Sequence, residues 1–339
     1  MPHDYLIIEQ FVTDALQSRA LQAAFDLGVI DALAEHENCD REDLLRGREC
    51  DADGGQFLLQ MLVRSNVVQS VGQTVALTDT FRAALRYRDL LTTKLTFSAM
   101  VAADYFEKMP QLLKSADDFM ATAKSFELFD YGRCIDITTA NCMLASRWMQ
   151  LTTMLTRYEA PVCHQHYDFG RHQHMLDVGG NSGEFVLQIC RRTPEIQATV
   201  IDLPVVCQVG QRHLQSEQEA SRIQFQPCNM LQNPFPEDCD LITWKSVLHD
   251  WPDDRISFLL QKSFDALPVG GTLLIFERQR LDFSVEDTPY GLLPVMLFFR
   301  SYREPDSYAT WLQQVGFSDI NLQTIQLEVP FCLITATKP

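Results

Sequence analysis

The chain has little positive charge. Of its 339 residues, 28 are lysine or arginine and 45 are aspartate or glutamate, so its formal net charge is −17. Such a protein repels nucleic acid and anionic membrane surfaces, and we expect neither as a partner. The first residues contain no basic cluster followed by an apolar core, and no apolar run approaches the roughly 18 residues of a membrane span. We therefore expect a cytoplasmic protein.

Paired cysteines are also missing. The ten cysteines stand singly, and no Cys-x-x-Cys occurs. Without a secretion signal, reduced thiols are the expected state. His164, His166, His172 and His174 have a side chain that binds metals, but they only flank a short loop before a strand. We expect no metal site.

Two nucleotide-binding motifs are absent. The dinucleotide fingerprint Gly-x-Gly-x-x-Gly would need glycine at position 178, which is valine. A P-loop would need Gly-Lys-Ser or Gly-Lys-Thr after the glycines, and neither follows. These absences argue against a site that binds the phosphates of a dinucleotide or of ATP.

The glycine motif that is present reads Asp177-x-Gly179-Gly180-x-x-Gly183, and Asp202 ends the next apolar run. This order is that of a nucleoside-binding βαβ unit: a strand, a glycine turn, a helix, and a second strand that ends in an acid. Glycine lets a ligand approach the backbone, and the acid can accept hydrogen bonds from two ribose hydroxyls. The alternative is a glycine turn with another ligand or none.

A second motif, Leu-His-Asp-Trp-Pro-Asp, follows the apolar run that ends at Lys245. Pro252 in this motif can open the next helix. Because open α/β sheets bind ligands at the carboxyl ends of their strands, we expect Lys245 and His249 near Asp177 and Asp202. A lone histidine at a strand end is usually structural, but this sequence context favours a catalytic one.

Together the two motifs closely resemble those of the plant-type small-molecule O-methyltransferases, which also occur in bacterial pathways, and the resemblance covers nearly the whole chain. It implies an α/β fold: a Rossmann-like class I methyltransferase domain with a seven-stranded mixed sheet and helices on both faces. A mainly helical winged-helix dimerisation domain would precede it. The resemblance also implies a homodimer, a small aromatic substrate and S-adenosylmethionine as methyl donor, with S-adenosylhomocysteine as product.

The resemblance assigns roles to individual residues. The expected cofactor-binding residues are Asp177, Gly179, Gly180, Gly183, Asp202, Leu203, Asn229, Met230 and Lys245. The expected catalytic residues are His249 as the base, Asp250 beside it, and Glu277 and Glu304, which would flank and orient the imidazole. The expected substrate-binding residues are Trp148, Met149, Met296 and Phe299. In two places the sequence departs from the family pattern: Asn229 stands where the family has aspartate, and the neighbours of Glu304 differ.

The chemistry of methyl transfer supports a histidine base independently. A phenol with a pKa of about 10 is mostly protonated at neutral pH. A neutral histidine, with an unperturbed pKa near 6.5, can take that proton as transfer proceeds. A carboxylate on the other ring nitrogen would fix the tautomer. For Glu277 and Glu304, the alternative is that they are ordinary solvated acids.

The first hundred residues differ in pattern from the rest. Apolar periodicity predicts helices near 5–17, 18–34, 41–46 and 55–66, followed by a hairpin that turns at Gly72. Helices followed by such a wing could also belong to a DNA-binding regulator. That class needs a basic recognition helix, and residues 51–66 hold two aspartates and a single arginine.

We predict three regions: a winged-helix-like dimerisation domain (1–100), linking helices that line the substrate pocket (101–160) and a catalytic domain (161–339). The linking helices are expected near 91–114 and 136–158. Strands and helices then alternate until a terminal strand pair, and the apolar stretch 289–299 reads as a core or pocket helix. The expected activity is O-methyl transfer. The alternatives are a C-methyltransferase, a non-methylating relative and a ligand-sensing winged-helix regulator.

Overall fold

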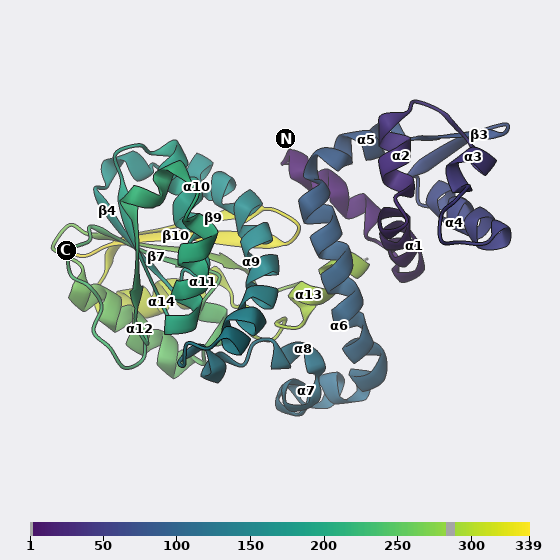
Figure 1. Cartoon of the computed structure of the whole chain (residues 1–339). Helices are drawn as coiled ribbons and strands as arrows, with labels where there is room; N and C mark the ends of the chain where they lie inside the picture. The colour runs from purple at the N-terminus through teal and green to yellow at the C-terminus, as the bar shows by residue number, and fades with distance from the viewer. Residues whose placement is uncertain (1–2, 283–288) are drawn as a thin grey trace. The chain divides into compact units, whose positions relative to one another are not determined.

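The computed structural model describes residues 3–282 and 289–339 and divides into two units (Figure 1). The first comprises Met1–Lys114 with Phe283–Leu297, and the second Ser115–Asp282 with Phe298–Pro339. Residues 1–2 of the expected first domain and 283–288 of the expected catalytic domain lie outside the described residues. The expected boundary at residue 100 falls within a long helix, α6, so the first unit extends beyond it.

The first unit is mainly helical. Its helices are η1 (Asp4–Phe11), α1 (Ala15–Asp26), α2 (Val29–Glu35), α3 (Arg41–Leu45), α4 (Ala52–Arg64), α5 (Asp79–Ala84), η2 (Leu85–Tyr87), α6 (Arg88–Lys114), η7 (Tyr290–Leu292) and α13 (Leu293–Met296). The predicted helices 5–17 and 18–34 have other boundaries. Asp14 caps α1 by accepting a hydrogen bond from the Gln17 amide, and Gly28, with φ +68°, separates α1 from α2.

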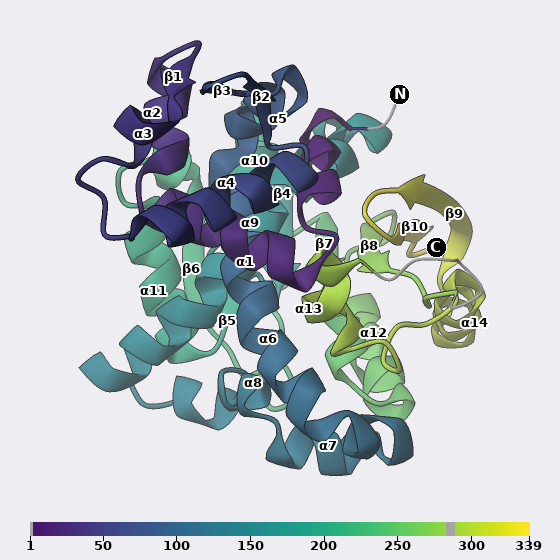
Figure 2. The same ribbon diagram turned by 90° about the vertical axis from the view of Figure 1, so that its right-hand side faces the viewer.

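The predicted hairpin is confirmed. Its strands β2 (Val68–Val71) and β3 (Thr74–Leu77) are antiparallel, and Gly72 in the turn has φ +62°. The short β1 (Cys39–Asp40) completes a sheet of order β1-β3-β2. Helix α2 packs on β3 and α4 on β2 (Figure 2). The helices with their two-stranded wing form the expected winged-helix pattern.

The second unit is built on a mixed seven-stranded sheet, as expected. Its strands are β4 (His174–Val178), β5 (Gln197–Asp202), β6 (Ile223–Pro227), β7 (Leu241–Lys245), β8 (Thr272–Arg278), β9 (Ser318–Gln326) and β10 (Pro330–Thr337). The order is β6-β5-β4-β7-β8-β10-β9. Strands β4 to β8 pair in parallel, and β10 runs antiparallel to both of its neighbours. The carboxyl ends of five strands therefore share one edge.

Helices cover both faces of this sheet (Figure 1). The helices of the unit are α7 (Ala116–Thr122), α8 (Lys124–Glu127), η3 (Tyr131–Cys134), α9 (Thr139–His166), η4 (Phe169–Arg171), α10 (Glu184–Arg192), α11 (Pro204–Leu214), η5 (Gln218–Arg222), η6 (Leu248–Asp250), α12 (Asp253–Ala266) and α14 (Pro305–Val315). Leu176 and Trp244 pack in one core cluster with residues of α12 and α14. Because side chains alternate along a strand, Asp177 and Thr243 point to the opposite face.

In the part of the chain that the structure describes, no helix is long and apolar enough to cross a membrane. All ten cysteines lie among the described residues, and all are free. Burial raises the pKa of the Cys190 thiol to about 11. Protonated, buried thiols of this kind are unreactive.

Candidate active site

The glycine turn between β4 and α10 packs tightly on its own protein. A Cβ on Gly180 would lie 2.4 Å from Asp177 Oδ2, and a Cβ on Gly183 would lie 2.7 Å from the Phe225 ring. Gly183 also has φ +75°, where other residues are strained. The glycines at 180 and 183 are therefore required by contacts inside the fold, in addition to the ligand access that the sequence suggested.

Several polar atoms around this turn fit a ligand that both donates and accepts hydrogen bonds. Asp177 Oδ2, Asn181 Oδ1 and Ser246 Oγ are buried and have no hydrogen-bond partner among the described residues. Buried polar groups in proteins are nearly always paired, so three such atoms around one turn call for a partner. An amino acid end with an ammonium group, such as that of S-adenosylmethionine, would supply donors to the two acceptors.

Asp202 ends β5 beside this turn. Its carboxylate accepts hydrogen bonds from the backbone amides of Asn181, at 2.9 Å, and Leu203, at 2.7 Å. These bonds fix the carboxylate while leaving further lone pairs available to ribose hydroxyls. Burial raises the pKa of Asp202 to about 6, although the two amides oppose it. Burial also raises the pKa of Asp177 to about 7, against a hydrogen bond from Thr243 and the charge of Lys245.

These raised pKa values predict that cofactor affinity depends on pH. Ribose hydroxyls and an ammonium group bind a carboxylate better than a carboxylic acid, so binding favours ionised Asp202 and Asp177. Affinity should therefore be full about one unit above pH 7 and fall as the pH drops through 7 and 6, because binding must then displace protons. Calorimetry between pH 5 and 8, in buffers of different ionisation enthalpy, measures both effects. A flat profile without proton release would contradict the assignment.

Two of the expected cofactor-binding residues, Asn229 and Met230, follow β6. The methyl carbon of Met230 and the side chain of Val247 lie 3.3 and 3.0 Å from where a Gly179 Cβ would stand, so these three residues border one space. Asn229 closes the local turn, since its Oδ1 accepts a hydrogen bond from the Leu231 amide at 3.0 Å. One lone pair of the Asn229 side-chain oxygen is therefore already used. The side-chain nitrogen of Asn229 remains a donor.

Lys245, at the end of β7, belongs to a buried chain of charges. Its Nζ lies 2.5 Å from a Glu159 carboxylate oxygen and donates to Thr156 Oγ1 at 2.8 Å. Glu159 also pairs with Arg278 at 2.5 Å, and Arg278 pairs with Glu328 at 2.9 Å. The four charges alternate and sum to zero, as buried ions require. The sequence did not predict this partner of Lys245, which comes from α9.

His249 lies next to Glu277, which belongs to β8. Its Nδ1 is 2.9 Å from Glu277 Oε2, and Glu277 Oε1 accepts hydrogen bonds from the amides of Val247 and Leu248 at 2.6 and 2.7 Å. The Glu277 side chain is fully buried and that of His249 is 10% exposed. Burial alone would lower the pKa of His249, but the carboxylates of Glu277 and Asp250 outweigh it and raise that pKa. A proton on Nδ1 leaves Nε2 free to accept one.

The second carboxylate at this imidazole is that of Asp250. Its Oδ1 lies 3.4 Å from His249 Nε2, and its Oδ2 accepts a hydrogen bond from the Tyr131 hydroxyl at 2.9 Å. Glu304, which we expected to flank the ring, is exposed and lies at the N-cap of α14. Among the described residues, the carboxylates that reach His249 are thus Glu277 and Asp250. No described contact joins Glu304 to the ring, and its expected role stays a prediction.

Aromatic rings surround the imidazole. Phe298 stands edge-on to it with centroids 5.6 Å apart, and the Tyr302 ring is 5.2 Å away. Phe126 and Phe129 each pack on Phe298 at 5.6 Å. This group, which we call the aromatic wall, suits a planar apolar substrate. The sequence offered one unused signal for it, three aromatic residues within positions 126–131.

The four expected substrate residues have different surroundings. Trp148 packs on Phe129, with ring centroids 6.2 Å apart, and so adjoins the aromatic wall, and it also packs on Tyr131 at 5.9 Å. Phe299 is half-buried under the guanidinium of Arg300, and its neighbour Phe298 is the residue that meets His249. Met296 ends α13 in the first unit, where it is half-buried.

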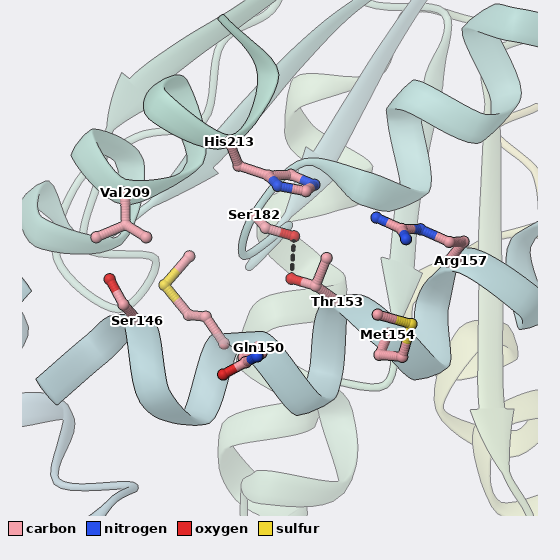
Figure 3. A pocket seen from close by; sticks show the side chains of 9 residues that line it. Ser146, Gln150, Thr153, Met154, Arg157, Ser182, Val209 and His213 are labelled. Carbon is pink, nitrogen blue, oxygen red and sulfur yellow. Dashed lines mark hydrogen bonds between the residues drawn. The ribbon is translucent and has the colours of Figure 1, made fainter. Parts of the chain in front are cut away.

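Met149 lines a separate cavity of about 350 Å³ between α9, the turn before α10 and α11 (Figure 3). The other lining residues are Ser146, Gln150, Thr153, Met154, Arg157, Ser182, Val209 and His213. Thr153 donates to Ser182 at 2.6 Å, and Arg157 and His213 both pair with Glu184. The lining includes neither His249 nor Asp202.

The four histidines considered as metal ligands have other partners. Three of them use Nε2 for a hydrogen bond: His164 with Thr193, His172 with the Tyr167 hydroxyl, and His174 with Thr199. The fourth, His166, accepts a hydrogen bond from Gln323 through Nδ1. Within the described residues, no group of three histidine, cysteine or acidic side chains is placed to hold a metal ion.

The second unit has the fold of the class I methyltransferases, with candidate cofactor and base residues at one sheet edge. A family model described as an O-methyltransferase domain matches residues 131–318, and one described as an O-methyltransferase dimerisation domain matches residues 10–85. The chain belongs to the O-methyltransferase family.

Individual relatives agree with this membership. The 3-hydroxy-5-methyl-1-naphthoate 3-O-methyltransferase of Streptomyces sahachiroi is 29% identical over 160 residues, which span 46% of each chain, so the match covers about half of that relative. Human acetylserotonin O-methyltransferase is 25% identical over 94% of each chain. The crystal structure of human N-acetylserotonin methyltransferase in complex with SAM is similar with a TM-score of 0.73, at 22% identity, over 96% of this chain and 94% of that one.

Proposed function

We propose that the protein is an S-adenosylmethionine-dependent O-methyltransferase that modifies a hydroxyl of a small aromatic, heteroaromatic or polyketide-like metabolite. Family membership and the cofactor-binding relative support the reaction type. The observation that carries the proposal is the His249–Glu277 pair, which adjoins the aromatic wall at the edge where the candidate cofactor residues converge.

The protein's own groups would perform two tasks. Glu277 holds the imidazole through Nδ1, so that the unprotonated Nε2 faces the acceptor hydroxyl and takes its proton. Asp202, Asp177 and the glycine turn would hold the cofactor, which supplies a methyl group on a positively charged sulfur. Alignment of the two reactants adds to the rate beyond general-base help.

The walls of the site favour an aromatic acceptor. Phe298, Tyr302 and Trp148 offer flat apolar surfaces, against which a planar ring can stack or pack edge-on. Two relatives are named for 3-O-methylation of a hydroxynaphthoate and for acetylserotonin. Their names agree with an acceptor of this type.

A product screen tests the proposal. The protein is incubated with S-adenosylmethionine that carries an isotope-labelled methyl group and with a panel of phenolic and heteroaromatic hydroxyl compounds. Label on oxygen supports the proposal, and label on carbon would replace it with C-methyl transfer. If the protein binds the cofactor but labels no acceptor, a non-methylating relative or a ligand-sensing regulator becomes the better description.

We further propose that the protein is a homodimer assembled through its first unit. The matched dimerisation model covers residues 10–85, and large apolar side chains are exposed in this unit, among them Leu16, Phe57 and Phe106. Helix α4 exposes Phe57 and Val63 and contains one basic residue, which disfavours the DNA-binding alternative.

Sedimentation tests the assembly. We expect a stable dimer at micromolar concentration, because exposed apolar patches of this kind are usually covered by a partner. Phe106→Asp, which places a charge on the exposed face of α6, should shift the protein toward monomer. Asp117→Ala, an exposed change in the second unit, is the matched control. A monomeric wild-type protein, or tight duplex DNA binding at physiological salt, would refute the proposal.

A further inference from the structure

The carboxylate of Asp250 is held by a residue far away in the sequence. Tyr131, in the short helix η3, donates its hydroxyl proton to Asp250 Oδ2 across a separation of 119 residues. Its ring packs edge-on against Trp148 in a cluster that also contains Phe129 and Val205. The position of the hydroxyl is therefore set by apolar packing, which makes it a fixed donor.

Both carboxylates at His249 accept hydrogen bonds, but Glu277 lies in the interior and Asp250 is partly exposed. Glu277 is fixed by the amides of Val247 and Leu248 and serves Nδ1. Asp250 is fixed by Tyr131 and lies beside Nε2. The carboxylate beside Nε2 therefore belongs to an acid that is held by a tyrosine.

We propose that Tyr131 is a positioning residue for the general base and acts through Asp250. Its hydroxyl holds the Asp250 carboxylate beside Nε2, so that the imidazolium formed by proton transfer has an anion next to each nitrogen. The inference rests on the proposed role of His249. Tyr131 and Asp250 form and break no covalent bond. The acceptor's hydroxyl proton moves to Nε2 and leaves later to water, and the flanking anions stabilise the charge in between.

Other charged and titratable groups also face the imidazole. Arg278 opposes its protonation, Glu277 favours it, and Tyr302 packs against the ring. The pKa of Tyr131 itself is raised well above the usual value by burial, then by Asp250 and Asp202. Tyr131 therefore remains a protonated donor at physiological pH.

The first test needs no turnover. In protein labelled at histidine, NMR follows the titration of His249 without cofactor, with the signal assigned from His249→Gln. Tyr131→Phe removes only the hydroxyl. The Asp250 carboxylate then loses the bond that holds it beside Nε2 and moves away, so the imidazolium loses stabilisation and the pKa of His249 should fall by roughly 0.5 or more. Asp250→Asn should lower it in the same direction. An unchanged His249 pKa in Tyr131→Phe would overturn the inference.

Tyr167→Phe is the matched control. It also removes a half-buried tyrosine hydroxyl, but that hydroxyl bonds His172 rather than Asp250. The His249 titration should be unchanged in this variant. A shift equal to that in Tyr131→Phe would show a general effect of hydroxyl removal and would overturn the proposed coupling.

A double-mutant cycle is the second test. With an acceptor found in the screen, Tyr131→Phe should lower kcat by about tenfold, leave cofactor affinity unchanged and move the acidic limb of the pH profile to lower pH. In an Asp250→Ala background, Tyr131→Phe should cost nothing further. If the kcat losses of Tyr131→Phe and Asp250→Ala multiply in the double variant, the inference is overturned. If the wild-type protein methylates nothing, the proposed function fails, while the NMR titration still decides the coupling.

Discussion

Replacement of His249 by alanine should lower methyl transfer by roughly 10²-fold or more, because the acceptor hydroxyl then loses the group that takes its proton. Cofactor affinity should be unchanged, since His249 contacts Glu277 and Asp250 and none of the residues around the glycine turn. The deficit should shrink for acceptors of lower hydroxyl pKa, which ionise without a base. Turnover measured against a series of substituted phenols, with calorimetry for cofactor binding, checks both statements.

The matched control for this prediction is His166→Ala. The imidazole of His166 is exposed and bonded to Gln323, so its removal should leave turnover as it is. Glu304→Gln should likewise have little effect, because that carboxylate is exposed at the start of α14. Full turnover in His249→Ala would show that alignment alone, or another residue, performs the reaction.

Replacement of Asp202 by alanine should weaken cofactor binding by roughly 1.5–3 kcal/mol, or about 10- to 150-fold, because charge-assisted hydrogen bonds to two ribose hydroxyls are lost. The variant also removes the acceptor of the Asn181 and Leu203 amides, so the turn itself loses two anchors. Asp202→Asn keeps an acceptor for one amide and should lose less. Calorimetry with S-adenosylhomocysteine measures these affinities without turnover.

Asp238→Ala provides the control for Asp202. Its carboxylate is 75% exposed and lies near His174, at the amino end of β4, whereas Asp202 lies at the carboxyl ends of the strands. The same change at Asp238 should therefore leave affinity unaltered. Equal affinity in Asp202→Ala and wild type would remove the ribose-binding role. It would also remove the part of the expected pH dependence near pH 6 that Asp202 supplies, while the part near pH 7 from Asp177 would remain.

Among the expected site residues, Glu304 has no described contact with the base. The sequence places this glutamate near the end of the chain, where the family has one that orients the base. In the structure, Gln279 and Arg303 form a bridge and Arg303 binds the Trp251 carbonyl at 2.7 Å, which fixes the segment before α14. Tyr302 then packs on the imidazole and Glu304 stays exposed. The neighbours of Glu304 in the sequence also differ from the family pattern.

The sequence by itself determined the candidate site residues at strand ends: Asp177 near the end of β4, Asp202 and Lys245 as the last residues of β5 and β7, and His249 shortly after β7. Each is marked by a local pattern, and parallel strands bring their carboxyl ends to one edge whatever the rest of the chain does. The alternation of strands and helices and the hairpin at Gly72 could likewise be predicted from local sequence patterns.

Only the tertiary structure decided which groups meet across long separations. Glu159 of α9 reaches Lys245 and Tyr131 of η3 reaches Asp250, and neither contact was expected. The pair of Glu277 and His249 was expected from the resemblance, and its geometry is set in the same way. These contacts depend on how α9, η3 and β8 pack on the sheet edge, and side-chain packing is specified by complementary shapes over many residues rather than by a motif. The residues that would bind the cofactor and take the proton are therefore marked in the sequence, whereas the groups that hold them in place come from packing.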